Sequence, residues 1–274
     1  MTTLIALADA IRIEQVEARA WMDHHAAAPK GTIETLGLRT RPLGGVALLA
    51  ANHSGSLLHN RAIGVGVLER ADEALLDTVV AHYSHTRQGF AINLSPWAAP
   101  PETEARLAAR GFQTYFHHVK WVRGVSPSPP VANTLPIAVA GPSDARRFAE
   151  TIHDADTHER DANLEWTAAC VGRPGWTHLL AFEGDEPVAG AALYVADNTA
   201  WLGQAHTREG FRRRGAQQAL IAERIRLAEA VGATLLTTET APDWPDLPRE
   251  SLRNVARAGF RLAYERPSWI RFPG

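Results

Sequence analysis

The chain has 274 residues, of which 45% are hydrophobic and 21% charged, and its formal net charge is -2. This length fits one large domain or two of modest size, and the composition is typical of a globular protein rather than a disordered or collagen-like chain. The near balance of charge excludes a global positive field that would draw the protein to nucleic acid or to an anionic membrane. Any basic site must therefore be local.

Cys170 is the one cysteine of the sequence. It excludes an intramolecular disulfide framework, CxxC redox chemistry and a thiolate zinc cluster, and it favours a reducing compartment. The first residues lack the basic stretch and long apolar core of a secretory signal. No apolar run approaches the roughly 20 residues that span a bilayer. We therefore expect a soluble, cytoplasmic protein with no membrane partner.

The first half of the chain predicts strands around one amphipathic helix. Residues 72–87 place apolar side chains at helical spacing, and Gly89 follows as a stop signal. Runs that contain short apolar stretches predict strands over 44–51, 57–67 and 89–96.

A proline-rich stretch, Gly124-Val125-Ser126-Pro127-Ser128-Pro129-Pro130, follows this first half. Because proline blocks the hydrogen bonding of helix and sheet, the stretch predicts a semi-rigid connector. We expect one domain over residues 1–124, a linker over 125–136 and a second domain over 137–274.

The second half predicts a mixed α/β domain. A helix begins at Pro142-Ser143-Asp144, and residues 154–176 lack a period and predict an irregular or partly helical loop. A second helix, about Gly215 to Val231, has a broad apolar face and ends at Gly232. Strands are predicted over 137–139, 178–184, 188–196, 200–207 and 234–240. The last two strands and the helix between them predict a right-handed parallel crossover.

Two segments of the chain repeat each other at an offset of 148 residues. Residues 107–123 and 255–271 align without gaps, and the matching positions include Gly111/Gly259, Phe112/Phe260, Trp121/Trp269 and Arg123/Arg271. Each segment predicts a helix that stops at glycine and is followed by a strand that carries aromatic residues. The repeat predicts two copies of one fold.

The chemistry is concentrated where the strand over 200–207 turns into the following helix. The turn, Thr207-Arg208-Glu209-Gly210-Phe211-Arg212-Arg213-Arg214-Gly215-Ala216-Gln217, has four arginines and two glycines. Backbone N–H groups at a helix start and the helix dipole both favour an anion, so the turn predicts a phosphate cradle. A solvated basic helix start is the alternative. A P-loop and a dinucleotide fingerprint are disfavoured because their spacings are absent.

The stretch over 212–217 resembles the acyl-CoA motif of the GNAT N-acetyltransferase superfamily, (Arg/Gln)-x-x-Gly-x-(Gly/Ala). Arg212 and Gly215 match the motif, whereas Gln217 departs at its last position. The resemblance continues through the helix, the strand over 234–240 and the closing segment NVARAGFRLAYERPSW, and covers residues 137–274. It implies an α/β fold with a mixed sheet, and the repeat then implies tandem GNAT-like domains of which the N-terminal one is degenerate.

The resemblance also implies where acetyl-CoA binds as co-substrate. Backbone amides of the turn would hold the pyrophosphate, and the end of the preceding strand would pair with the pantetheine arm. The implied residues are Ala205, His206, Thr207, Arg212, Arg213, Arg214, Gly215, Ala216 and Gln217. Asn254 would bond the pantetheine arm or lie on the helix surface. The matching junction of the first half, residues 66–73, has one arginine and three carboxylates, so we expect a single CoA site.

Acetyl transfer to an amine needs a neutral nitrogen, donors for the oxyanion and a proton for the departing thiolate. In the superfamily a tyrosine four residues before the closing glycine often supplies that proton, and this chain has Val255 there. We expect His206 or Glu239 as general base, although a scaffold role is the alternative for both. Substitute acids are Tyr264, Tyr194 and Ser251, or no acid is needed.

Other polar and aromatic residues are weaker candidates. Residues 153–161 are rich in His, Asp and Glu but match no calcium-loop or zinc spacing, so we expect no metal; in the superfamily this region caps the acceptor site, and a solvated loop is the alternative. Four tryptophans would line an acceptor pocket or fill the core: Trp166, Trp176, Trp201 and Trp244. Cys170 has no base paired with it, which favours inert packing.

Two classes of function follow. The first is an acetyl-CoA-dependent N-acetyltransferase that transfers acetyl to a primary amine of a small molecule by direct attack. The second is a non-catalytic acyl-CoA-binding or interaction protein on a GNAT scaffold. A nucleic-acid-binding module is disfavoured because the arginines are confined to one bend. Two halves that mimic a single-domain dimer favour a monomer or a weak homodimer.

Overall fold

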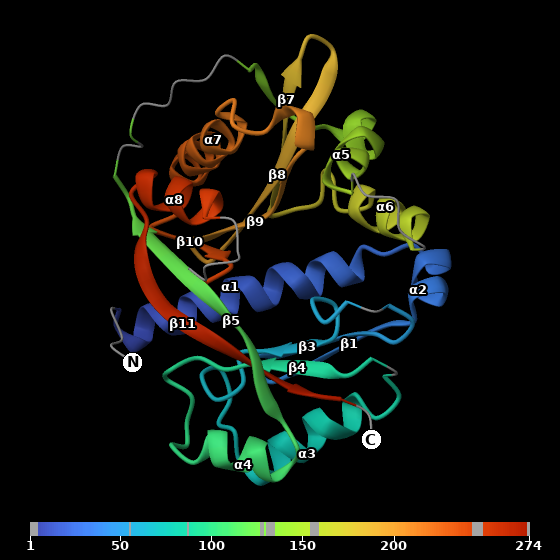
Figure 1. Cartoon of the computed structure of the whole chain (residues 1–274), viewed down its shortest axis with the longest axis vertical. Coiled ribbons are helices and arrows are strands. Elements are labelled where there is room, and N and C mark those ends of the chain that lie inside the picture. Colours follow the sequence, from blue (N-terminus) through green and yellow to red (C-terminus); the bar gives the residue numbers. More distant parts are fainter. Residues whose placement is uncertain are drawn as a thin grey trace. The chain divides into compact units, whose positions relative to one another are not determined.

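The computed structural model describes residues 5–54, 56–86, 88–126, 129, 135–153, 159–242 and 249–272. It divides the chain into two compact units (Figure 1). Unit 1 contains residues 1–26, 30–120 and 263–274, and unit 2 contains residues 27–29 and 121–262. Among the described residues, none of the helices combines the length and apolar character needed to cross a membrane.

Unit 1 is built on a mixed sheet. Its elements are α1 (Leu7–Ala26), α2 (Lys30–Leu36), β1 (Leu38–Leu43), β2 (Val46–Ala51), β3 (Arg61–Ile63), α3 (Glu73–His82), β4 (Phe90–Asn93), α4 (Thr103–Ala109), the first part of β5 (Gln113–Gly124) and most of β11 (Arg261–Arg271). The strand order is β1-β2-β3-β4-β11-β5. β3 and β4 are parallel, whereas β1, β2 and β3 form antiparallel neighbours and β11 is antiparallel to β4.

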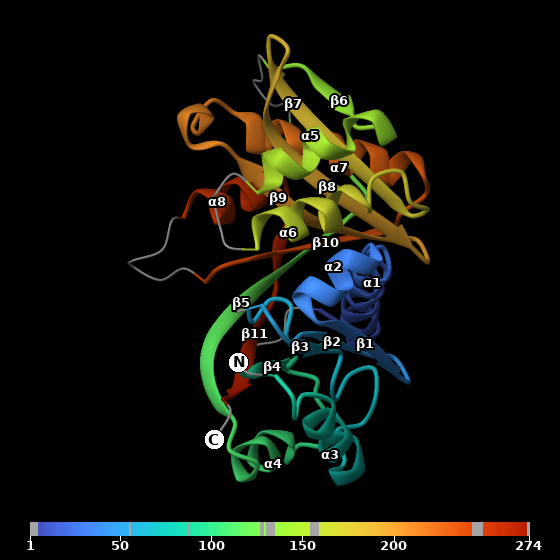
Figure 2. The ribbon, with the colours of Figure 1, turned by 90° about the vertical axis from the view of Figure 1, so that its right-hand side faces the viewer.

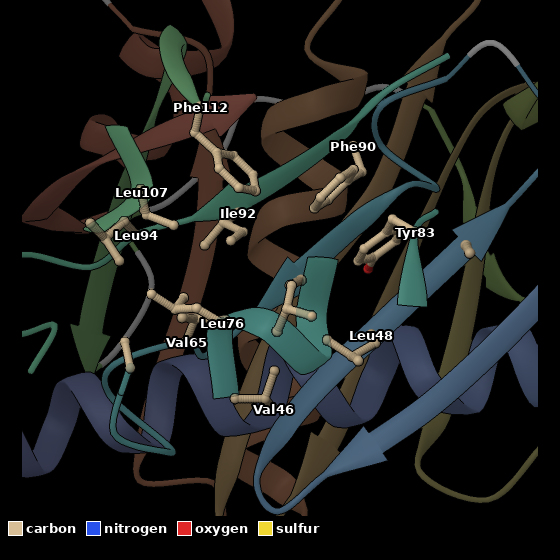
Figure 3. Packing of buried hydrophobic residues seen from close by; sticks show 14 residues of the cluster. Val46, Leu48, Val65, Leu76, Tyr83, Phe90, Ile92, Leu94, Leu107 and Phe112 are labelled. Atoms are coloured by element: carbon tan, nitrogen blue, oxygen red, sulfur yellow. The ribbon is translucent and has the colours of Figure 1, made fainter. Parts of the chain in front are cut away.

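Helices cover both faces of this sheet. α1 lies on one face, and α3 and α4 lie on the other (Figures 1 and 2). The side chains of β4 alternate between these two layers. Phe90 and Ile92 point into the core beneath α3 and α4, and their neighbours point to the opposite face. Figure 3 shows this core, in which Tyr83 stacks on Phe90 with ring centroids 4.3 Å apart.

Charged side chains are buried between α1 and the sheet of unit 1. Glu17 of α1 accepts from Lys120 Nζ at 2.6 Å and from Arg266 at 2.8 Å, and Arg61 Nη2 lies 3.5 Å from it. Glu14 accepts from Arg266 at 2.9 Å. These five side chains, which we call the charge cluster, are all at most 2% exposed. Burial alone would raise the pKa of Glu17, but its three cationic neighbours hold that pKa well below the ordinary value.

Unit 2 is also a mixed sheet with helices on both faces. Its elements are β6 (Ile137–Val139), the 3-10 turn η1 (Pro142–Asp144), α5 (Ala145–Ile152), α6 (Arg160–Ala168), β7 (Trp176–Glu183), β8 (Glu186–Ala196), β9 (Thr199–Thr207), the 3-10 turn η2 (Glu209–Phe211), α7 (Ala216–Ala230), β10 (Leu235–Thr240) and α8 (Glu250–Arg257). The strand order is β10-β9-β8-β7-β6. α5 and α7 lie on opposite faces (Figures 1 and 2). β9, α7 and β10 form the predicted parallel crossover.

The two repeated segments have the same local structure. α4 and α8 each end just before a glycine in the left-handed region, Gly111 with φ 82° and Gly259 with φ 83°. Phe112 and Phe260, which follow them, are 2% and 4% exposed. A long strand comes next in both segments, so the repeat read from the sequence is a repeat of structure.

The long strands change unit, which differs from the expected boundaries at 1–124, 125–136 and 137–274. β5 begins in unit 1, but its last residues, 121–124, belong to unit 2. β11 begins in unit 2, but from Ala263 onward it belongs to unit 1 and pairs with β4. The repeat locates these strands in the sequence, but it does not say which sheet each joins. Within the expected linker, residues 127, 128 and 130–134 lie outside the described residues.

Some predicted elements differ in extent. The strand expected over 57–67 is limited to Arg61–Ile63, and the helix expected over 72–87 ends at His82. α6 shows that the segment expected to be irregular or partly helical is partly helical. The helices α1 and α2 were not predicted from the sequence. In α1 the buried Glu14 and Glu17 interrupt the apolar pattern that would indicate a helix.

Candidate active site

The start of α7 presents an uncapped helix N-terminus. The chain leaves β9 at Thr207, passes through η2 and enters α7 through Arg213, with φ 64°, and Gly215, with φ 84°. Gly215 is the N-cap residue, and no side chain caps the helix there. A left-handed conformation at Gly215 suits glycine, since other residues are strained there. The N–H groups of the first turn have no acceptor within the helix and can hold an anion.

The four arginines of this turn do different things. Arg208 Nη1 pairs with Glu186 at 2.8 Å, and Arg214 Nη1 pairs with Glu183 at 2.6 Å, so both are tied to the β7–β8 hairpin. Arg212 Nε donates to the carbonyl of Thr207 at 3.2 Å and holds the end of β9. Arg212 and Arg213 are exposed beside the N-terminus of α7. The basic turn is therefore partly a structural brace and partly an exposed positive surface.

β9 and β10 separate at the end that faces this turn. Their parallel register ends at the pair Thr238 and Leu202, although β9 continues to Thr207 and β10 to Thr240. Ala205 is exposed, and His206 and Thr207 are half-buried. Beyond the last pair, β9 presents a strand edge to which an amide-rich ligand can add by backbone hydrogen bonds.

A bulge in β9 lies at the start of this opening. Ala191 of β8 is opposite Ala205 and Ala192 is opposite Gly203, so Gln204 is the extra residue, with φ 42°. A Cβ at Gly203 would collide with the ring of Trp201, which makes glycine necessary there. Bulges of this kind bend a strand and re-aim its backbone groups.

A buried arginine of α7 holds the bulge. Arg224 is 3% exposed, and its Nη1 donates to the carbonyls of Ala192 at 3.2 Å and Gly203 at 3.3 Å. Its Nε donates to the carbonyl of Leu220 at 3.1 Å. Burial lowers the pKa of Arg224 to about 9. These three hydrogen bonds of the buried guanidinium all go to backbone carbonyl oxygens.

His206 and Glu239 lie on the two strands that border the opening. Glu239 is half-buried and comes one residue after the last β9–β10 pair. His206 is opposite Gly190, on the face of the sheet covered by α5. His153, at the end of α5, bonds the hydroxyl of Thr167 through Nε2 at 2.7 Å. The pKa of His153 is lowered by burial first and then by the charges of His206 and Arg160. The structure thus brings His153 into electrostatic contact with His206.

Asn254 joins α8 to α7. Its amide nitrogen donates to Gln217 Oε1 at 2.7 Å, and its oxygen accepts from Gln218 Nε2 at 3.0 Å. Gln217 also donates to Ser251 Oγ at 3.0 Å. Both polar atoms of the Asn254 side chain thus hold α8 against α7, and the pantetheine contact stays a prediction. Val255 is 4% exposed and apolar, so it offers no proton.

Tyr264, one of the residues expected to act as acid, is 2% exposed and lies in unit 1. Its hydroxyl donates to Glu14 at 2.7 Å, and burial together with the charge of Glu14 raises its pKa well above the ordinary value. Tyr264 therefore belongs to the polar core of unit 1.

The weaker candidates fill the interior. Trp166, Trp176 and Trp201 are at most 7% exposed, and Cys170 is fully buried. Residues 154–158 and Trp244, which were also candidates, lie outside the described residues. Within the part of the chain that the structure describes, no group of three His, Cys, Asp or Glu side chains has metal-binding geometry.

Sequence reasoning missed Gln204 and Arg224. Arg224 follows Leu220 by four residues and precedes Ala228 by four, so helical spacing already places it on the buried face of α7. That signal was available. No comparable signal marks Gln204, because a bulge follows from the pairing of two strands and not from one of them.

Comparison with known proteins agrees with this geometry. Residues 144–245 match the family model described as Acetyltransferase (GNAT) family. No curated protein matches the chain.

Several solved structures share the fold. A GCN5-related N-acetyltransferase from Kribbella flavida is 18% identical, with a TM-score of 0.65 over 95% of this chain and 96% of that one. A tandem GNAT protein from the clavulanic acid biosynthesis pathway is 16% identical, with a TM-score of 0.60 over 98% of this chain and 95% of that one. These likenesses extend through both units, so the tandem architecture expected from the repeat is confirmed.

Proposed function

We propose that the chain is an acetyl-CoA-dependent N-acetyltransferase that acts on a primary amine of a small molecule. The match of residues 144–245 to the GNAT acetyltransferase family model supports this proposal. The observation that carries the proposal is the uncapped N-terminus of α7 beside the strand edge that opens between β9 and β10. A helix start of this kind suits a pyrophosphate, and the open strand edge suits the amides of a pantetheine arm.

The residues of unit 2 divide the binding of acetyl-CoA between them. Backbone N–H groups from Arg213 to Gln217 would hold the pyrophosphate, with Arg212 and Arg213 adding charge-assisted contacts. The backbone from Ala205 to Thr207 would pair with the pantetheine arm. Arg224 would keep the bulge at Gln204 in place through the carbonyls of Ala192 and Gly203.

Acetyl-CoA would supply an activated thioester, and the acceptor amine would attack it directly. His206 would take the proton from the amine, since it lies on β9 next to the opening and within electrostatic reach of His153. Glu239 borders the same opening from β10 and is the second candidate base. Backbone N–H groups beside the bulge would stabilise the oxyanion. With the apolar Val255 on α8, the thiolate would take its proton from solvent.

The alternative is a GNAT scaffold that binds acyl-CoA without turnover. It is favoured by one observation: Val255 occupies the position where a tyrosine would protonate the leaving thiolate in the superfamily that the chain resembles. This alternative keeps the same cradle and differs only in chemistry.

Release of CoA thiol in the presence of a panel of small primary amines tests the proposal. We expect release that depends on one class of amine, and a loss of about 10²-fold or more in the His206→Gln variant. His85→Gln, the same change at an exposed position, is the matched control and should keep the native rate. Binding of acetyl-CoA without release for any amine would favour the non-catalytic alternative.

A further inference from the structure

Unit 1 contains a pocket that is separate from the proposed acetyl-CoA site in unit 2. Its volume is about 240 Å³. The lining residues all belong to unit 1 and come from β3, β4, β5, β11 and the segment before β3: Leu57, Leu58, Arg61, Ala91, Asn93, Tyr115, Phe116, His118, Ser268 and Ile270. Ala91 and Asn93 alternate along β4 with the core residues of Figure 3, so the pocket opens on the face away from α3 and α4.

The pocket combines apolar walls with a buried polar floor. Leu58 and Tyr115 are 43% and 69% exposed, which places them at its mouth. At the floor, Asn93 and Ser268 are 1% and 4% exposed, and Asn93 Nδ2 donates to Ser268 Oγ at 2.8 Å. Arg61 is 2% exposed, and its Nη1 lies 3.4 Å from Asn93 Oδ1.

Arg61 connects this floor to the charge cluster. It shares the carboxylate of Glu17 with Lys120 and Arg266, and its contact of 3.5 Å is longer than theirs at 2.6 and 2.8 Å. Arg61 is the one cation of this cluster among the residues that line the pocket. A cation at the floor of an apolar pocket favours an anionic group there, because charge-assisted hydrogen bonds are stronger where water is excluded.

Size limits the ligand. A cavity of about 150 Å³ holds benzene, so a pocket of this volume suits a molecule of roughly ten non-hydrogen atoms. The apolar walls of the pocket favour a ligand with an apolar body. The polar floor favours a small, charged hydrogen-bond acceptor on that ligand. A carboxylate can accept from Arg61 and from the hydroxyl of Ser268, whose Oγ also lies 3.4 Å from His118 Nδ1. A phosphate ester would put more charge against apolar walls than one arginine offsets.

We infer that unit 1 binds a small organic carboxylate with an apolar body, its carboxylate on Arg61 and Ser268 and its body against Phe116, Ile270 and Ala91. This site does not depend on acetyl-CoA binding or on acetyl transfer in unit 2. The proposed ligand thus belongs to unit 1, whose acidic junction over residues 66–73 is unsuited to CoA.

The test is calorimetric titration of the full chain with hexanoate and with hexanamide, which has the same length and no charge. We expect hexanoate to bind at least about tenfold more tightly than hexanamide. Equal affinity of the two probes, or no binding of hexanoate, would overturn the inference.

Two variants locate the binding. Ala91→Leu fills the pocket and leaves the charge cluster intact, so hexanoate binding should be lost; Ala81→Leu, on the exposed face of α3, is the matched control and should bind normally. Ser268→Ala should weaken binding about fivefold to tenfold by removal of one hydrogen bond. Unchanged binding in Ala91→Leu with a native melting temperature would contradict the inference. Acetyl-CoA affinity, measured on the same samples, should stay native in every variant.

Discussion

The helices that connect the parallel strands of each unit, α3 between β3 and β4 and α7 between β9 and β10, begin in opposite ways. α3 is capped by Asp72, whose carboxylate accepts from Leu75 N at 2.8 Å, and Glu73 follows in its first turn. α7 begins at Gly215 without a side-chain cap. Negative charge at a helix start stabilises the helix and repels a phosphate, whereas an uncapped start leaves its N–H groups for a ligand.

The space beside each helix start also differs. In unit 1 the chain itself closes it, because Ala99 N donates to the carbonyl of Gly66 at 2.9 Å and Ala71 N donates to the carbonyl of Ala99 at 2.8 Å. A Cβ at Gly66 would lie only 2.7 Å from Ala98. In unit 2 the register of β9 and β10 ends and leaves the strand edge open. The comparison of the two units shows that the same architecture allows the junction between strand and helix to be either closed or open.

Buried charge separates the units as well. Unit 1 pairs its buried carboxylates with cations, whereas unit 2 satisfies Arg224 with backbone carbonyls. The stability of unit 1 therefore depends on a complete charge cluster. In unit 2 a single residue, Arg224, holds the bulge of β9 in place.

The largest expected effect comes from Glu17→Gln. It removes the carboxylate that faces three buried cations and should cost about 3–5 kcal/mol of unfolding free energy, measured by chemical denaturation. The pKa of Glu17 is lowered in the folded state, so its stabilisation is present above the unfolded value and is lost as the pH falls through the lower folded value. The variant should lack this acid-dependent loss.

Glu34→Gln is the control for that experiment. Glu34 pairs with Lys30 at 3.8 Å and both side chains are largely exposed, so the change should cost less than about 1 kcal/mol. Equal costs for Glu17→Gln and Glu34→Gln would mean that the charge cluster does not hold unit 1 together.

Arg224→Met tests the hold on the bulge. Methionine fills much of the same space without the donors to Ala192 and Gly203, so those carbonyls lose the buried partner that holds the bulge. We expect the rate of amine acetylation to fall about tenfold while the Kd for acetyl-CoA changes less than about threefold. Arg226→Met, an exposed change on the same helix, should have no effect; an equal loss there would remove the special role of Arg224.

Asp72→Ala gives the smallest effect. Loss of the cap should cost about 1 kcal/mol of unfolding free energy. Because the junction is also closed by the pairing of Gly66 and Ala99, the variant should gain no affinity for acetyl-CoA. A second acetyl-CoA site in this variant would show that the cap alone separates the two junctions.

Local signals predicted much of the fold and the glycine bend at the start of α7. The glycine stops at Gly111 and Gly259 and the bend at Gly215 depend on short stretches of backbone, so the sequence indicates them directly. Features that depend on distant partners were not predictable in the same way. Glu17 finds its cations on β3, β5 and β11, and Tyr264 and Asn254 find partners on α1 and α7.

The unit to which each end of β5 and β11 belongs was not predictable for the same reason. Each strand follows its helix as the repeat predicts, but which sheet it completes depends on contacts that no local pattern contains.

The central claim is that α7 alone presents an acetyl-CoA cradle. The most direct measurement is calorimetric titration of acetyl-CoA into the native chain and into the double variant Arg212→Glu/Gly215→Asp, which gives α7 the acidic character of α3. Arg70→Glu, at the matching junction of unit 1, is the control. We predict one site per native chain, the same site in the control, and a loss of at least about a hundredfold in affinity in the double variant with a folded protein. Two sites in the native chain, none, or native affinity in the double variant would contradict the claim.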